Sequence, residues 1–167
     1  MSHQPHLVTR SEHGPEKDTR ALIIERFDLP FGVEYLKYKL GWDPRYAEKA
    51  IEEYRRFLRL AYDSPTEITP SEPVDEVWHI HILHTKSYAH LAERCGKMLH
   101  HNPGMPSQAA KWNAQYALTL TQYEATFGDP PPPSHWPVQP SRAKVEGTFG
   151  RALRVWRERG VNKQIEH

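Results

Sequence analysis

The strongest constraint on the fold is a helical repeat of apolar residues that follows Asp43. The carboxylate of Asp43 is suited to cap the free amides of a helix, and Pro44 stands at the first helical position, where its missing N–H group has no partner to lose. The apolar side chains after it recur at intervals of three and four residues, which places them on one face of a helix. They are Ala47, Ile51, Tyr54 or Leu58, and Ala61. No segment alternates convincingly between apolar and polar residues as a strand does, so the sequence predicts an all-α fold.

Start and stop signals place further helices on either side of this one. Residues 19–40 carry apolar positions interrupted by a proline and a glycine, which favours two short helices around a turn. A second long helix is expected from Ser71 to Cys95, with Gly96 as its left-handed cap. Ser107 is placed to cap a further helix that displays aromatic residues at helical spacing. The sequence thus predicts a compact orthogonal bundle of about five helices.

Composition divides the chain into four segments. Residues 1–18 are polar, show no periodic apolar face, and are interpreted as a flexible N-terminal arm. The helical domain is expected over residues 19–128. Residues 129–141 contain four consecutive prolines, which exclude a helix or a central strand and predict an extended proline-rich strap. Residues 142–167 are predicted to form a last amphipathic helix, rich in arginine, and a tail.

Length, charge and cysteine content narrow the class of protein. A chain of 167 residues fits one ordinary hydrophobic core. The formal net charge of +1 provides no global field that would attract nucleic acid. No run approaches the roughly 20 apolar residues of a membrane span, and no apolar signal core follows the first methionine. A single cysteine rules out an intrachain disulfide and suits a reducing compartment, so we expect a cytoplasmic protein.

Histidine is concentrated in one stretch of the chain. Six of its 11 histidines fall within positions 79 to 101, and Asp75, Tyr88 and Cys95 accompany them. These six are His79, His81, His84, His90, His100 and His101. Imidazole is the commonest metal ligand and is well suited to proton transfer near neutral pH, so this density predicts a metal or catalytic site. The other histidines are expected to be solvent-exposed: His3, His6, His13, His135 and His167.

Helical geometry separates these side chains into two groups. Each residue advances about 100°, so His79 and His81 point about 200° apart and cannot readily chelate one ion on an intact helix. Asp75 lies one turn before His79, where a carboxylate can orient the imidazole. His81, His84 and Tyr88 share a second face at spacings of three and four residues. Asp75 with His79 is therefore the first candidate pair, and the other three residues form the second group.

The length of the predicted helix restricts which of these groups His101 can join. From His79 to Cys95 a straight helix rises roughly 24 Å, whereas the following loop can return at most about 17 Å. His84, His90 or Tyr88 would meet His101 more easily. A site that combines His79 with His101 requires a kinked helix or a second subunit in a homodimer.

The same region resembles the glycine-rich-domain-containing-protein-like family, which occurs as short bacterial proteins and as the N-terminal region of longer plant proteins. The resemblance spans about residues 27 to 103 and rests on Glu53-Tyr54-Arg55-Arg56-Phe57-Leu58, Pro70-Ser71, the run Val74 to Leu83, Thr85, Tyr88, Cys95 and His100-His101-Asn102-Pro103. It implies no secure activity, but points at Asp75, Trp78, His79, His81, Tyr88, Cys95 and His101. His84 departs from the family pattern, so its candidacy rests on spacing alone. The glycine-rich tail that names the family is lacking here.

Two hypotheses for the function follow. In the first, a small metal-binding helical protein uses His79, His81, His84 and His101 to hold Zn, Cu or Fe, and acts as a tailoring enzyme on a small-molecule substrate. Tyr88 or an Asp75-oriented histidine would then handle protons.

In the second hypothesis, the protein is a non-catalytic interaction module. Trp78, Tyr88 and the histidines then form a hydrogen-bonded core, while the arginine-rich helix or the proline strap contacts a partner. A single histidine on a partly apolar helix is more often such a packing residue than a ligand. Cys95 is likewise expected to pack as a small apolar group, and His100 is a secondary candidate beside His101.

Overall fold

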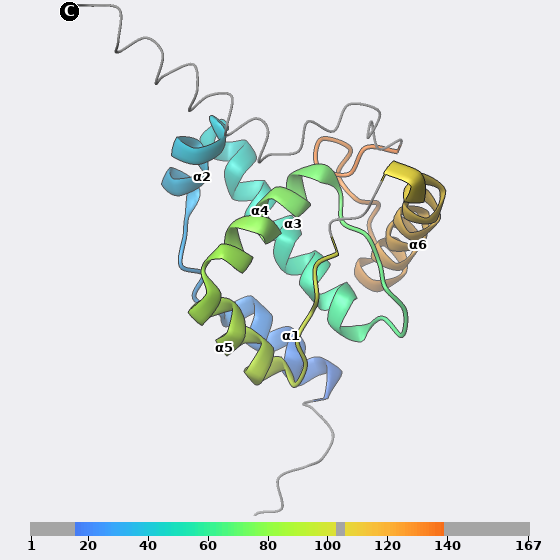
Figure 1. Ribbon diagram of the computed structural model, residues 1–167, viewed down its shortest axis with the longest axis horizontal. Helices are drawn as coiled ribbons and strands as arrows, with labels where there is room; N and C mark the ends of the chain where they lie inside the picture. The colour runs from blue at the N-terminus through green and yellow to red at the C-terminus, as the bar shows by residue number, and fades with distance from the viewer. Residues whose placement is uncertain (1–15, 103–105, 139–167) are drawn as a thin grey trace, which may run out of the picture.

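A computed structural model describes residues 16–102 and 106–138 of the chain (Figure 1). These residues form six α-helices and one short 3₁₀ helix, and no strand occurs among them. The helices are α1 (Lys17–Arg26), α2 (Val33–Leu40), α3 (Pro44–Asp63), α4 (Glu72–Leu83), α5 (Thr85–Cys95) and α6 (Ala109–Phe127), with the 3₁₀ turn Pro106–Gln108 before α6. The predicted all-α class is confirmed. The described part holds one helix more than the roughly five that we expected for the whole chain.

Helix α3 forms the centre of the bundle, with α1, α2, α4 and α6 packed around it (Figure 1). Its first turn is capped as predicted, because an Asp43 side-chain oxygen accepts a hydrogen bond from the Arg45 amide at 2.9 Å. Of its apolar face, Ala47 and Tyr54 have no exposed surface and Leu58 is buried, while Ile51 and Ala61 are partly buried against the core. The helical repeat identified in the sequence therefore does organise the core.

The predicted single helix from Ser71 to Cys95 is wrong, because the chain breaks at His84. The backbone there has φ of −86° and ψ of 64°, and the His84 amide bonds to the His81 carbonyl instead of to the carbonyl four residues back. That carbonyl, of Ile80, instead accepts a hydrogen bond from Nδ1 of the His84 ring at 2.8 Å. The side chain thus replaces the backbone donor, since a histidine near the end of a helix can bond to one of its last carbonyls. The break turns α5 away from the axis of α4 (Figure 1).

The start of α6 also differs from the expectation. Ser107 does not cap this helix, because a 3₁₀ turn precedes it and Gln108 occupies the cap position without a side-chain hydrogen bond. Tyr116, Thr119 and Tyr123 form the buried face of the helix. Gly128 ends it in a left-handed conformation.

The proline-rich strap is part of the core. Its Trp136 is 1% exposed, and the indole N–H donates to Oε2 of Glu53 at 2.9 Å. Glu53 lies on α3 with no exposed surface, and the same oxygen accepts the Tyr123 hydroxyl at 2.8 Å. Lys49 lies 3.2 Å from the other carboxylate oxygen. A buried carboxylate needs such partners, so these contacts join the strap to α3 and α6.

His135, which we expected to be exposed, is only 2% exposed. Its ring stacks on Tyr46 at 4.1 Å between centroids, and its Nε2 donates to the Tyr46 carbonyl at 3.0 Å. The expectation failed because the strap carries no periodic pattern that would indicate which of its side chains turn inward.

Several of the predicted segments lie wholly or partly outside the described residues. These include most of the N-terminal arm, the arginine-rich helix from 142 to 167, and four of the histidines expected to be exposed: His3, His6, His13 and His167. Helix α1 begins at Lys17, so the last two residues assigned to the arm are helical. No helix in the described ranges combines the length and the hydropathy needed to cross a membrane.

Candidate metal centre

After the turn at His84, α5 runs away from α4, and the segment that follows α5 comes back toward α4 (Figure 1). Gly96 ends α5 with a φ of 86°, a left-handed conformation that favours glycine and that the sequence predicted. The hydroxyl of Tyr88, on α5, donates to the Leu99 carbonyl at 2.5 Å. The returning loop is therefore tied to the helix that precedes it, and it carries His101 to the side of α4.

Three side chains meet where this loop crosses α4. Nε2 of His101 donates to Oδ1 of Asp75 at 2.9 Å, and Nδ1 of His79 lies 3.6 Å from Oδ2 of the same carboxylate. The two imidazole rings are 4.2 Å apart between centroids. One ligand atom from each of the three residues lies within 4.8 Å of the other two. Asp75, His79 and His101 thus form a compact cluster that contains two imidazoles and one carboxylate.

The cluster lies at the surface. The side chains of His101, Asp75 and His79 are 13%, 19% and 42% exposed, so the cluster has one open side. Nδ1 of His79 is itself buried and makes no hydrogen bond. Metal–nitrogen and metal–oxygen bonds of about 2.0 to 2.2 Å place ligand atoms roughly 3 Å apart, so small side-chain movements would bring the three groups around one ion.

Trp78 and Tyr88 support the cluster from the core side. The Trp78 indole donates to the Tyr88 hydroxyl at 2.9 Å, and the Trp78 ring meets His101 edge to face at 4.7 Å. Burial raises the pKa of Tyr88, although the hydrogen bond from Trp78 opposes the shift. With its hydroxyl donating to Leu99 and accepting from Trp78, Tyr88 lies beneath the loop and does not join the three clustered side chains.

His81 lies apart from the cluster, in the core. Nδ1 is 2.8 Å from the Tyr54 hydroxyl and Nε2 is 3.1 Å from the Ser87 hydroxyl, so both ring nitrogens are occupied. Burial first, and then the nearby charges of His84 and Arg55, lower the pKa of His81 to about 4. The imidazole is therefore neutral at pH 7. Sequence reasoning missed Tyr54 and Ser87 as its partners, because nothing in the sequence pattern separates Tyr54 from the other residues of the apolar face.

The remaining candidate residues are dispersed. His84 occupies the helix break, where its ring contacts Phe31 and Tyr35. His100 is exposed, and Cys95 is 2% exposed. Burial raises the pKa of the Cys95 thiol, which keeps it protonated and a poor nucleophile at neutral pH.

The angular separation of His79 from His81 is as expected, but His101 joins Asp75 and His79 instead of the second group. The distance estimate failed because it assumed a straight helix up to Cys95. A site that combines His79 with His101 was expected to require either a kinked helix or a second subunit. The helix is kinked at His84, and the three side chains meet within a single chain.

The fold and the cluster define an all-helical protein whose described part holds one group of Asp and His side chains close enough to share a metal ion. A family model described as UCP032817-like matches residues 19–123, which is more than half of the chain. The chain therefore belongs to the UCP032817-like family, and the matched region contains all three residues of the cluster.

One similar protein is "Glycine-rich domain-containing protein 2" of Arabidopsis thaliana. The two are 30% identical over 91 residues, a match that covers 50% of this chain and 12% of the plant protein. This match confirms the resemblance to glycine-rich domain-containing proteins. The chain corresponds to only a small part of that relative's length, so the plant protein's activity is not transferred. No solved structure matches the chain.

Proposed function

We propose that this protein binds a transition metal ion through Asp75, His79 and His101. The observation that carries the proposal is the convergence of one carboxylate and two imidazoles from two separate segments, with ligand atoms within 4.8 Å of one another. His81 and His84, which the sequence also indicated as ligands, are not part of this proposed site, because both ring nitrogens of His81 bond to Tyr54 and Ser87, and Nδ1 of His84 bonds to the Ile80 carbonyl.

Three protein ligands leave coordination positions for water and a small-molecule substrate. A set of two histidines and one carboxylate is found in non-haem iron oxygenases, and three-ligand zinc sites activate water. The two histidines and one carboxylate do not by themselves identify the metal as Zn, Cu or Fe. Any of them would suit a cytoplasmic tailoring enzyme of a biosynthetic route, in which the metal supplies Lewis-acid or redox chemistry at the open side of the cluster.

The hydrogen bond between Asp75 and His101 also makes metal binding depend on pH in this proposal. Its carboxylate already accepts a hydrogen bond from Nε2 of His101, so binding of a metal at that nitrogen would displace a proton. Metal affinity is therefore expected to fall as the pH is lowered, since protons compete with the ion for the imidazoles. Trp78 contacts His101 from the core side and keeps the ring close to Asp75.

Elemental analysis of the purified protein, followed by titration of the metal-free protein with Zn²⁺, Fe²⁺ and Cu²⁺, tests the proposal. We expect about one equivalent of metal, and a loss of affinity of at least about 100-fold for His79→Ala and for His101→Ala. His100→Ala is the matched control, because His100 is exposed and adjacent to His101. Equal affinities for His100→Ala and His101→Ala would contradict the proposal.

One observation favours the competing candidate, a non-catalytic interaction module. His101 bonds to Asp75, and Trp78 bonds to Tyr88, which bonds to Leu99. The edge contact between Trp78 and His101 joins these two sets into one network, in which the hydrogen-bonding groups have protein partners without an ion. If the network is only structural, the wild-type protein will take up no metal, and His101→Ala will lower the melting temperature. The metal titration and the melting curve together distinguish the two candidates.

A further inference from the structure

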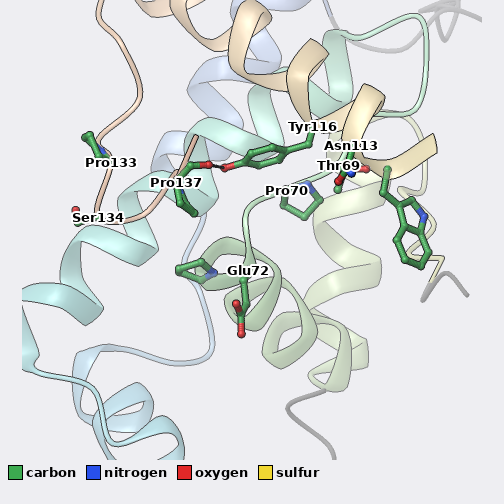
Figure 2. Close-up of a pocket in the computed structure, with 10 residues that line it drawn as sticks. Thr69, Pro70, Glu72, Asn113, Tyr116, Pro133, Ser134 and Pro137 are labelled. Atoms are coloured by element: carbon green, nitrogen blue, oxygen red, sulfur yellow. Dashed lines mark hydrogen bonds between the residues drawn. The ribbon is translucent and has the colours of Figure 1, made fainter. Parts of the chain in front are cut away.

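A groove lies at the first turn of α4, between the start of that helix, the N-terminal half of α6 and the strap (Figure 2). It has a volume of about 140 Å³. Four prolines and two aromatic side chains supply its apolar walls: Pro70, Pro73, Pro133, Pro137, Trp112 and Tyr116. The Tyr116 hydroxyl donates to the Pro137 carbonyl at 2.9 Å, the dashed line in Figure 2, and this bond fixes the strap to α6 at the groove.

The groove and the metal cluster are neighbours along α4. Glu72, which lines the groove, stands three residues before Asp75, and Asp75 stands four residues before His79. Side chains at these spacings share one face of a helix, with Cβ atoms about 5 to 6 Å apart. A molecule bound at Asp75 therefore has the groove within about one helical turn, roughly 5 Å along the helix axis.

The interior of the groove carries no charge. Glu72 is the single ionisable side chain among the described residues that line it, and Figure 2 shows the Glu72 carboxylate turned away from Tyr116. The other polar side chains of the lining are neutral: Thr69, Asn113 and Ser134. The groove is therefore suited to the uncharged end of a ligand, and a charged end has to find its partner outside the groove.

The volume of the groove restricts the size of that uncharged end. Pockets for cofactors and drug-sized molecules commonly have about 300 to 1,000 Å³, so this groove is too small for a nucleotide or a coenzyme. An apolar protein cavity of about 150 Å³ accepts a benzene molecule. The groove, at about 140 Å³, thus has room for one six-membered ring.

The metal cluster supplies the partner for a charged end. Imidazoles bind a metal in their neutral form, so Asp75 is the single charged ligand among the three residues. A divalent ion held by them keeps one net positive charge, and it faces the open side of the cluster. One carboxylate of a ligand would balance this charge.

We propose that the groove and the cluster form one substrate site for a small arylalkanoic acid, whose carboxylate coordinates the metal while its aromatic ring lies in the groove against Trp112 and the prolines. This inference rests on the proposed metal site and names the substrate class for it. A chain of two or three carbons between ring and carboxylate spans the helical turn that separates the two parts. The orientation is unique, because the groove lining offers the carboxylate no cation.

Titrations of the full-length protein, with and without one equivalent of Zn²⁺, test the proposal by two-dimensional NMR of the backbone amides. The probes are 3-phenylpropanoate, acetate, which lacks the ring, and 3-phenyl-1-propanol, which lacks the carboxylate. In the zinc-loaded protein we expect 3-phenylpropanoate to bind at least about 10-fold more tightly than either of the other two. In the metal-free protein its advantage over the alcohol should disappear.

Two variants test the position of the ring. Trp112→Ala removes a wall of the groove, and Asn113→Trp fills the groove from an exposed position, so each should reduce the advantage of 3-phenylpropanoate over acetate at least about fivefold. Both should leave zinc affinity unchanged. Leu118→Ala is the matched control, because Leu118 is an exposed apolar residue of α6 outside the groove lining.

The possible results separate this inference from the proposed metal site. The inference is overturned, and the metal site stands, if zinc binds but 3-phenylpropanoate and acetate bind equally, or if Asn113→Trp keeps the full difference between them. An advantage of 3-phenylpropanoate over the alcohol that persists without zinc would also overturn it, because the carboxylate would then lie elsewhere. A protein that takes up no zinc refutes the proposed function and this inference together.

Discussion

The buried imidazole of His81 makes the stability of the fold depend on pH in a predictable direction. His81 has no exposed surface, and burial lowers its pKa to about 4 in the folded protein, against an ordinary value of 6.5 in the unfolded chain. Between these two values the unfolded chain binds more protons than the native state. The free energy of unfolding therefore falls as the pH is lowered through this window, and the full contribution of His81 is retained above pH 6.5.

The magnitude follows from the two pKa values. A difference of about 2.5 units corresponds to about 3 kcal/mol once the pH is below both values, of which roughly half is lost between pH 6.5 and pH 5. For a domain of this size such a loss is a large fraction of the total stability, because most domains are stable by only about 5 to 15 kcal/mol.

Urea unfolding followed by tryptophan fluorescence at several pH values measures this loss. Carboxylates also titrate near pH 5, so the informative quantity is the difference between wild type and His81→Gln, which cannot take up a proton. We expect the variant to be less stable at pH 7 but to lose about 1 to 2 kcal/mol less than wild type between pH 6.5 and pH 5. His90→Gln, at an exposed position, should keep the wild-type dependence. If wild type and His81→Gln lose the same free energy over this range, the burial argument is refuted.

Three further predictions concern the elements around the site. Tyr88→Phe removes the hydroxyl that bonds to Leu99, and should weaken metal binding by about 10-fold in a chelator competition, since supporting groups typically contribute this much. Trp136→Ala should lower the free energy of unfolding by about 3 to 5 kcal/mol, measured by denaturant unfolding; a change below about 1 kcal/mol would show that the strap is not part of the cooperative fold. Gly96→Ala should lower stability by about 1 to 2 kcal/mol in the same assay, because its φ of 86° strains any residue with a Cβ; an unchanged midpoint would contradict this.

The sequence predicted those parts of the fold that depend on local chemistry. The Asp43–Pro44 start of α3, the start of α4 at Ser71 and the left-handed Gly96 each follow from a few neighbouring residues, and each is present. The two short helices of the region 19–40 were predicted for the same reason.

The parts that sequence reasoning missed depend on competition between side chain and backbone, or on contacts between distant segments. The break at His84 occurs where the ring takes the Ile80 carbonyl, and no periodicity reveals that outcome. Trp136 is buried because Glu53 lies opposite it, a contact across 83 residues. The neighbours of His101 could not be predicted without the break. The Asp75–His79 pair was therefore predictable from the sequence, but His101 as its third member was not.

The buried carboxylate of Glu53 also indicates how much chain this fold needs. The family match ends at Tyr123, whereas the indole that covers Glu53 belongs to Trp136, thirteen residues further along. A shortened chain that ended at Tyr123 would lack Trp136. The Glu53 carboxylate on α3 would then lose the indole hydrogen bond and become exposed to water. The smallest piece that folds independently is therefore expected to extend through the strap, and family boundaries drawn from sequence similarity alone would divide the core.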